Sequence, residues 1–308
     1  MRQRSVRLIV NPLSRHLPDE GALVSATTWL EDRGWAVDRH QTECSGHAKA
    51  LATAAAASGF DVVVVCGGDG TVNEAVNGIA GTGTALAVIP AGTANVWAKE
   101  IGVRRDTLFA ARCVDEGERR RVDVGSADGR YFLLLATVGT DSQAVFAVTA
   151  ARKRRWGRLV YVAAGLDDLF RNGGRSMVID ADGERIATRA LVAIAGNSRS
   201  YGGVMVAALH AHMDDGLLDL CVYTGRGWRE LAGHAWRTIR HRHDRSVGVI
   251  YRQVRSIRIE PTHPVAVEVD GEYIGRSPMT FQIVPKALTV IVPRGLRSPL
   301  FTEPPAPE

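Results

Sequence analysis

Cysteine is scarce and scattered in this chain of 308 residues. The four cysteines lie far apart and form no CxxC pair; they are Cys44, Cys66, Cys113 and Cys221. This spacing excludes a disulfide framework and a cysteine-rich zinc site, and it favours a reducing compartment. We therefore expect all four to be single buried thiols.

Long apolar runs are also missing. The longest, such as YFLLLATVG at 131–139, suit buried strands and are too short to span a bilayer. The basic N-terminus has an apolar part only as long as a strand, so we expect no secretory signal. With 45% hydrophobic and 23% charged residues, the composition predicts a soluble globular protein, and the length predicts two domains.

Lysine is rare, so arginine carries nearly all of the positive charge; the lysines are at positions 49, 99, 153 and 286. The formal net charge of +5 and the pI of about 9.2 favour anionic partners, such as nucleotides, phosphates, acidic lipid surfaces or nucleic acid. No aromatic stacking platform or recognition motif for nucleic acid appears, so we expect no nucleic-acid partner.

Strands alternate with helices over residues 1–115. The run DVVVVCGGDG at 61–70 is apolar throughout its first part, as expected for a strand that is covered on both faces. Short connections between alternating elements predict an open, mostly parallel sheet with right-handed crossovers. This half is therefore an α/β domain.

The pattern changes after about residue 121. Short apolar runs separated by turn signals such as ADG and VDGE predict an antiparallel β-rich domain. Helical segments interrupt it near 143–170 and 228–243. We predict a nucleotide-binding domain at 1–122, which the segment 288–303 can rejoin, a lipid-substrate domain at 123–287, and a disordered tail at 302–308.

The segment CGGDGTVNE at 66–74 places glycines between a buried strand and a helix. Such a turn is typical of phosphate binding, because glycines let the backbone approach an anion and the helix N-terminus offers N–H groups. The P-loop pattern GxxxxGK[ST] is absent, and the Rossmann pattern fails because Asn73 stands where its last glycine is needed. A carboxylate beside phosphates, Asp69, suits a bridging divalent cation. The alternative is a tight turn in which Asp69 only caps the helix.

A second turn of this kind follows about twenty residues later, in PAGTAN at 90–95. The carboxyl ends of neighbouring parallel strands meet at one edge of a sheet, so the two turns can line one crevice. The joint pattern is much more specific than either half.

GGDGTVNE followed by PAGTAN resembles the diacylglycerol kinase catalytic family, which includes bacterial lipid kinases, sphingosine kinases and ceramide kinases. Further motifs match in the same order: NP at 11–12, TxxxGHA at 42–48, GTD at 139–141, YGG at 201–203, DDGLLDL at 214–220 and VDGE at 269–272. The resemblance implies ATP-dependent phosphorylation of a lipid hydroxyl with Mg²⁺. It also implies an α/β domain similar to NAD kinase and phosphofructokinase, joined to a C-terminal antiparallel β-sandwich.

The resemblance also implies roles for particular residues. Asp69 and Glu272 would be catalytic, with Glu272 accepting the proton of the substrate hydroxyl. The nucleotide would lie against Thr42, Gly67, Gly68, Gly70, Thr71, Asn73, Glu74, Gly92, Thr93 and Asn95. A structural Mg²⁺ would lie between Asp215 and the main-chain oxygens of His212 and Leu217. Taken alone, Glu272 is a solvated hairpin residue, Asp215 belongs to an Asp-Gly turn, and Thr42 is a helix cap.

Departures from the family pattern leave the acceptor open. Val96 follows Asn95 where the family usually has aspartate, Arg15 replaces a glycine, Thr137 stands at another glycine position, and Ala208 replaces a frequent proline. Diacylglycerol, phosphatidylglycerol, a sphingoid base and a polyprenol-like alcohol all remain candidates. The rivals are a kinase of a soluble acceptor, such as NAD or a sugar phosphate, and a non-catalytic lipid-binding member of the fold.

A lipid acceptor requires contact with a membrane surface. The basic segments at 151–161 and 227–245 carry tryptophan beside arginine, so either can dock on anionic headgroups. In the competing interpretation, both are helices with solvated basic faces. We expect a cytoplasmic protein that binds an anionic membrane peripherally; a homodimer is one of the oligomeric states that the sequence allows.

Overall fold

The computed structural model describes residues 3–139, 173–201, 205–240, 243–244, 246–302 and 304. The predicted helix near 143–170, the basic segment at 151–161 and parts of the motifs at 139–141 and 201–203 lie outside these residues. Of the predicted tail, only Thr302 and Pro304 are described.

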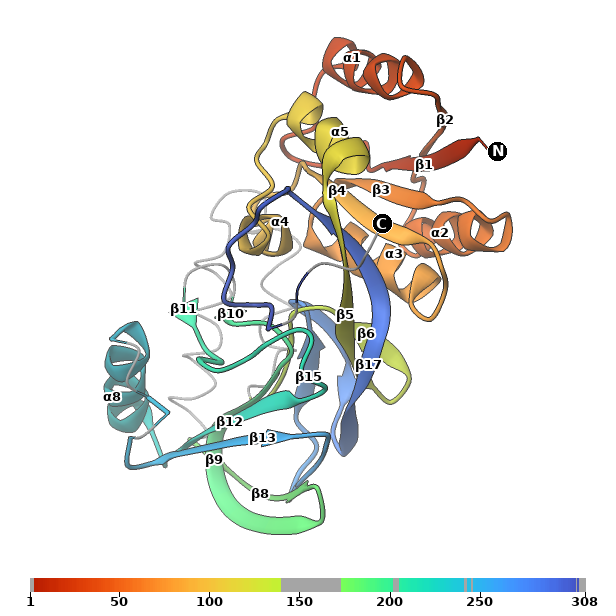
Figure 1. Cartoon of the computed structure of the whole chain (residues 1–308). Helices are drawn as coiled ribbons and strands as arrows, with labels where there is room; N and C mark the ends of the chain where they lie inside the picture. Colours follow the sequence, from red (N-terminus) through yellow and green to blue (C-terminus); the bar gives the residue numbers. More distant parts are fainter. Residues whose placement is uncertain are drawn as a thin grey trace.

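The N-terminal half is an α/β domain whose first four strands are parallel in the order β4-β3-β1-β2 (Figure 1). The strands are β1 (Arg4–Val10), β2 (Trp35–Gln41), β3 (Val62–Gly67) and β4 (Ala85–Pro90). The helices are α1 (Glu20–Glu31), α2 (His47–Ala57), α3 (Asp69–Ile79), α4 (Val96–Glu100) and α5 (Thr107–Glu116). Every residue of β3 and β4 is buried, because helices cover both faces of the sheet.

The second half is built almost entirely of antiparallel strands. They are β5 (Glu118–Ala127), β6 (Arg130–Phe132), β7 (Leu135–Val138), β8 (Arg175–Ala181), β9 (Glu184–Gly196), β10 (Ser200–Tyr201), β11 (Met205–Val206), β12 (Leu218–Thr224), β13 (Val249–Val254), β14 (Ser256–Pro261), β15 (Ala266–Val269), β16 (Glu272–Arg276) and β17 (Met279–Val292). Helix α8 (Trp228–Ile239) stands beside them. The prediction of a parallel α/β domain followed by an antiparallel β domain is confirmed.

The long strands β5 and β17 connect the two halves (Figure 1). At one end β17 pairs with β14, and at the other it joins the first sheet beside β4, with Thr289 opposite Ala85. The C-terminal strand thus adds to the sheet of the N-terminal half. One hydrogen-bonded sheet therefore runs through both halves and joins the antiparallel strands of the second directly to the parallel strands of the first.

Candidate active site

A cleft lies at the carboxyl edge of the parallel sheet. It has a volume of about 440 Å³, within the range of sites that bind small molecules. Loops that follow all four parallel strands contribute to it, and one side chain comes from the other half of the chain. The lining is formed by Asn11, Leu13, Ser14, Arg15, Thr42, Glu43, Cys44, Ser45, Gly68, Gly70, Thr71, Glu74, Gly92, Thr93 and Glu272. Both predicted glycine turns therefore face one cleft.

The two glycine turns touch each other through their backbones. A Cβ atom built on Gly92 would lie 2.5 Å from the Cα atom of Gly68, and one built on Gly68 would lie 3.3 Å from the Cα atom of Gly92. Gly67 is also constrained, because a Cβ there would lie 2.8 Å from the Cβ of Thr71. Glycine is needed at Gly68 and Gly92 because the strand ends meet without room for side chains.

The second turn is fixed from within by Asn95. Its side-chain oxygen accepts a hydrogen bond from the N–H of Gly92 at 2.8 Å, and its amide donates to the carbonyl of Gly92 at 2.9 Å. The same carbonyl lies 3.1 Å from Nδ1 of His16 and accepts from Arg105 at 2.8 Å. Asn95 is buried and has a left-handed backbone, with φ of 49°. It shapes the turn and does not line the cleft.

Asp69 connects the two turns. Its Oδ1 accepts a hydrogen bond from the N–H of Trp97 at 3.3 Å, in the first turn of α4. Its neighbours Gly68 and Gly70 line the cleft, but Asp69 itself stands beside that lining. The carboxylate therefore supports the second turn and stays beside both glycine turns. It does not cap α3, whose N-cap residue is Gly68 with no side-chain cap hydrogen bond, so the interpretation of Asp69 as the cap of that helix is wrong.

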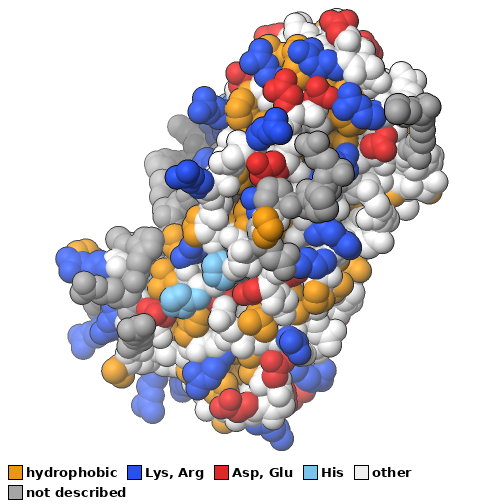
Figure 2. Space-filling view, viewed as in Figure 1, with side chains coloured by type: hydrophobic (Ala, Val, Ile, Leu, Met, Phe, Trp, Pro, Cys, Tyr) orange, Lys and Arg blue, Asp and Glu red, His pale blue; other side chains and the backbone are white. Residues whose placement is uncertain are grey.

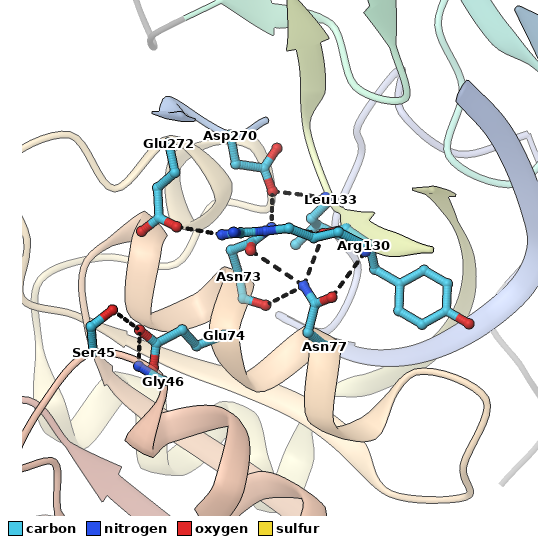
Figure 3. A network of polar contacts seen from close by, with 10 residues as sticks. Ser45, Gly46, Asn73, Glu74, Asn77, Arg130, Leu133, Asp270 and Glu272 are labelled. Carbon is cyan, nitrogen blue, oxygen red and sulfur yellow. Dashed lines mark hydrogen bonds and ion pairs between the residues drawn. The ribbon is translucent and has the colours of Figure 1, made fainter. Parts of the chain in front are cut away.

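Glu272 reaches the cleft from the second half of the chain. It begins β16, and its Oε1 lies 2.6 Å from the position of a Cβ built on Gly70. Its Oε2 accepts from Arg130 at 2.6 Å (Figure 3). The sequence places these groups 202 positions apart, yet the fold packs the carboxylate directly against the glycine turn.

A buried polar clamp holds the Glu272 hairpin against α3. Asp270 is the first residue of the two-residue turn between β15 and β16, and its carboxylate accepts four hydrogen bonds. One donor is Asn73 of α3, at 2.8 Å (Figure 3); the others are the backbone N–H groups of Leu133, Leu134 and Leu135. Burial raises the pKa of the Asp270 carboxyl, and the four donors oppose this rise. Asn73, predicted as a nucleotide ligand, thus joins the two halves and does not line the cleft.

Three other predicted nucleotide residues line the cleft while making contacts within the protein. Glu74 caps α2, since its carboxylate accepts from the N–H groups of Gly46 at 2.8 Å and Ala48 at 3.1 Å. Thr71 accepts from the side chain of Asn11 at 2.9 Å. Thr42 lines the cleft but does not cap α2, because the cap residue is Gly46 and the carboxylate that bonds this end of the helix belongs to Glu74. The capping interpretation of Thr42 is therefore wrong.

Several cleft residues were missed by sequence reasoning. Asn11, Leu13 and Arg15 follow β1, which lies beside β3 in the sheet, so the rule for neighbouring strand ends applies to them too. Cys44 is exposed and lines the cleft, so the prediction that all four thiols are buried is wrong for it. The other three cysteines are buried. Among the described residues of the lining, Arg15 is the one cationic side chain, beside the carboxylates of Glu43, Glu74 and Glu272.

The predicted structural metal site lies in the loop before β12. Asp215 accepts from the N–H of Leu217 at 3.0 Å, and the buried Asp123 holds the loop by accepting from Gly216 at 2.6 Å. Burial raises the pKa of the Asp215 carboxyl, and Asp123 and Asp214 add to this effect. Across the described ranges, no three His, Cys, Asp or Glu side chains are arranged to hold a metal ion. A cation here must rely on main-chain oxygens, which suit hard cations such as Mg²⁺.

Comparison with known families agrees with this geometry. Residues 5–127 match the family described as Diacylglycerol kinase catalytic domain, and residues 135–292 match the family described as YegS C-terminal NAD kinase beta sandwich-like domain. The chain belongs to the diacylglycerol kinase family. The second match confirms the predicted β-sandwich. Membership of this family makes the chain a lipid kinase, and kinases of this family use ATP.

Relatives of the family are similar over nearly their whole length. A diacylglycerol kinase of Bacillus subtilis is 29% identical over 94% of this chain and 97% of its own. One from Staphylococcus aureus is 30% identical over 96% of this chain and 94% of its own. The crystal structure of a diacylglycerol kinase from Bacillus anthracis has a TM-score of 0.79 at 25% identity, covering 96% of this chain and 99% of that one.

Proposed function

We propose that this enzyme transfers the γ-phosphate of ATP to the hydroxyl of diacylglycerol or a closely related glycerolipid. The observation that carries the proposal is the shared cleft: two touching glycine turns form one wall, and Glu272 from the β domain stands against them. Relatives named diacylglycerol kinase match this chain over more than nine-tenths of its length, which favours this acceptor over NAD or a sugar phosphate.

The glycine turns would hold the phosphates. The N-terminal turn of α3 presents backbone N–H groups and the positive end of the helix dipole at the cleft. The carbonyl oxygen of Gly92 contacts His16, Arg105 and Asn95. It is therefore engaged within the protein and would not repel a phosphate in the cleft. Arg15 adds one positive charge at the cleft wall.

Mg²⁺ fits this cleft as a partner of the nucleotide. Mg²⁺ is commonly held by one or two carboxylates together with phosphate oxygens and water, and Asp69 beside the two turns provides such a carboxylate. When bound, the ion would neutralise charge on the transferring phosphoryl group. The part of the lining that the structure describes contains three carboxylates and one arginine, so phosphate binding here would benefit from an added cation. The Asp215 loop would hold the second, structural ion.

Glu272 would accept the proton as the lipid hydroxyl attacks. Its carboxylate lines the cleft opposite the phosphate-binding turn, so a hydroxyl placed between them would face both groups. A general base contributes roughly 10²–10⁴-fold to the rate of such a step. Alignment of the two substrates by the cleft would contribute the rest, because phosphoryl transfer depends mainly on positioning and electrostatics.

The purified protein is incubated with labelled ATP, Mg²⁺ and vesicles that contain diacylglycerol, phosphatidylglycerol, a sphingoid base or a polyprenol, with NAD as a soluble alternative. We expect label in phosphatidic acid, and a loss of roughly 10²–10⁴-fold for Glu272→Gln. Glu184→Gln, an exposed carboxylate at the start of β9, serves as control. Labelling of NAD alone, or full activity of Glu272→Gln, would contradict the proposal.

Helix α8 supports peripheral binding to an anionic membrane. Within the described ranges, no helix is long and apolar enough to cross a bilayer. Trp236 on α8 is 58% exposed, and the guanidinium of Arg240 lies 4.5 Å from its ring centre. Arg229 and Arg237 are also exposed, and Val247, in the loop after α8, is 94% exposed. Figure 2 shows basic and hydrophobic side chains together at the edge of the molecule over α8.

Tryptophan flanked by arginine is suited to the headgroup layer, where the ring is partly buried and the cations face acidic lipids. We expect the wild type to sediment with vesicles that contain phosphatidylglycerol, and less with purely zwitterionic ones. Combining Trp236→Ala with Val247→Ser should weaken this binding. Val24→Ser removes an exposed apolar residue from α1, far from α8, and should not. If all variants sediment equally with the vesicles, α8 does not contact the membrane.

A further inference from the structure

The carboxylate of Glu272 is held by an arginine that belongs to neither glycine turn. Arg130 is the first residue of β6, immediately after the Asp128-Gly129 turn, and its Nη2 donates to Oε2 of Glu272 at 2.6 Å (Figure 3). The two side chains are each 40% exposed. Arg130 itself is not among the residues that line the cleft, so it stands behind the carboxylate as seen from the nucleotide side.

The ion pair leaves the two oxygens of Glu272 in different surroundings. Oε2 points to the guanidinium of Arg130, whereas Oε1 points to Gly70 at the start of α3. A methyl group at position 70 would lie 2.6 Å from Oε1. One oxygen is thus fixed from behind, and the other faces the phosphate-binding turn, where a proton acceptor is needed.

Arg130 is itself fixed relative to that turn. The next residue, Tyr131, exchanges two hydrogen bonds with the side chain of Asn77 on α3, both at 2.9 Å. Asn73, one turn earlier on α3, donates to the carbonyl of Tyr131 at 3.1 Å. The base of the Arg130 side chain therefore moves with α3, whose N-terminus forms the glycine turn. A side chain on such a support can orient a functional group more sharply than one on a free loop.

We propose that Arg130 is a positioning residue for catalysis: it holds the Glu272 carboxylate in the orientation that faces the phosphate-binding turn. This rests on the proposed role of Glu272 as proton acceptor. An ion pair exposed to this degree adds little to folding stability, so stability gives a weak reason for arginine here. A guanidinium with its planar fork fixes the direction of a carboxylate better than an ammonium group does.

The expected effect follows from the freedom that Glu272 would gain. Its first two side-chain torsions have three staggered wells each, which allows roughly nine arrangements. If Arg130 selects one of them, its loss should lower kcat by about tenfold, because the reacting groups are aligned for a smaller fraction of the time. The KM for ATP should not change, since Arg130 does not line the cleft.

A double-mutant cycle tests the proposal in the full-length protein, with kcat and KM for ATP measured on diacylglycerol vesicles. Arg130→Met should lose about tenfold in kcat with KM unchanged, and Arg130→Lys should recover part of that loss. In the Glu272→Gln background, Arg130→Met should have no further effect, because it acts through the missing carboxylate. Arg185→Met, which removes an exposed arginine of β9, is the matched control and should behave like the wild type.

Wild-type kcat in Arg130→Met, or the same loss in both backgrounds, overturns the positioning role while leaving Glu272 in place as the proton acceptor. A rise in KM for ATP instead of a fall in kcat assigns Arg130 to nucleotide binding and also overturns it. If the single variant Glu272→Gln is fully active, Glu272 is not the proton acceptor, and the role proposed for Arg130 is contradicted as well. Thermal denaturation of each variant shows whether a loss reflects unfolding, and Arg130→Lys remains informative if Arg130→Met does not fold.

Discussion

The contact between Gly68 and Gly92 gives the sharpest prediction of the structure. Gly92→Ala would place a methyl group 2.5 Å from the Cα atom of Gly68 and 2.8 Å from Oδ1 of Asn95. Carbon atoms in non-bonded contact prefer about 3.5–4.0 Å, so the two turns must separate by about 1 Å or more. The new methyl group would collide with a backbone atom, the Cα of Gly68, so no side-chain rotamer change can relieve the contact.

A displacement of about 1 Å at a site that aligns phosphates can lower the rate roughly hundredfold. Gly92→Ala should therefore reduce kcat/KM for ATP by about 10²-fold, while overpacking destabilises the fold by about 1–3 kcal/mol. Gly68→Ala should be milder, because its methyl group would lie 3.3 Å from the nearest backbone atom. Gly83→Ala is the control: nothing lies within 4 Å of a Cβ there, and its φ is not in the left-handed region.

Steady-state kinetics with diacylglycerol vesicles, binding of a non-hydrolysable ATP analogue by calorimetry and thermal denaturation would be measured for all three variants. The expected order of damage is Gly92→Ala, then Gly68→Ala, then Gly83→Ala. If Gly92→Ala binds the analogue and turns over within about threefold of the wild type, the two turns do not form a joint phosphate site and the reasoning fails.

Three further predictions address the clamp, the thiols and the metal loop. Asp270→Asn should lower the free energy of unfolding by about 1–3 kcal/mol in chemical denaturation. The amide group of asparagine would put an N–H₂ donor where a carboxylate oxygen now accepts from backbone N–H groups. Unchanged stability would argue against the clamp. Burial raises the pKa of Cys66 and Cys221 to about 12 and that of Cys113 to about 11, so these groups remain protonated thiols at pH 8. A thiol reagent should then modify Cys44 rapidly and the three buried thiols slowly, and bound ATP should slow the reaction of Cys44. The buried thiols should react faster as the pH rises. Rapid modification of more than one cysteine at pH 8 would contradict this. If Mg²⁺ binds the Asp215 loop, a chelator should lower the melting temperature of the wild type but not of Asp215→Asn. The matching loss in free energy of unfolding is about 2.7 kcal/mol if Mg²⁺ was present at a hundred times its Kd; an unchanged melting temperature of the wild type would contradict a bound ion.

The local elements and the edge of the sheet that forms the site were determined by the sequence. Apolar runs without polar interruptions predicted β3 and β4 as strands covered on both faces, and glycines after each predicted the two turns that now line the cleft. These inferences work because strand periodicity, helix starts and the steric freedom of glycine are properties of neighbouring residues. Parallel strands then bring their carboxyl ends together whatever the rest of the chain does.

Only the tertiary structure decided which polar residues face the cleft and which hold the molecule together. Asn73 belongs to the glycine motif, yet it pairs with Asp270, 197 positions away, and Glu74 caps the neighbouring helix α2. Arg130 carries no motif at all, and only the folded chain brings it to Glu272, 142 positions away (Figure 3). A buried polar group must find a hydrogen-bond partner, and that partner is set by packing between distant segments, which local sequence does not encode.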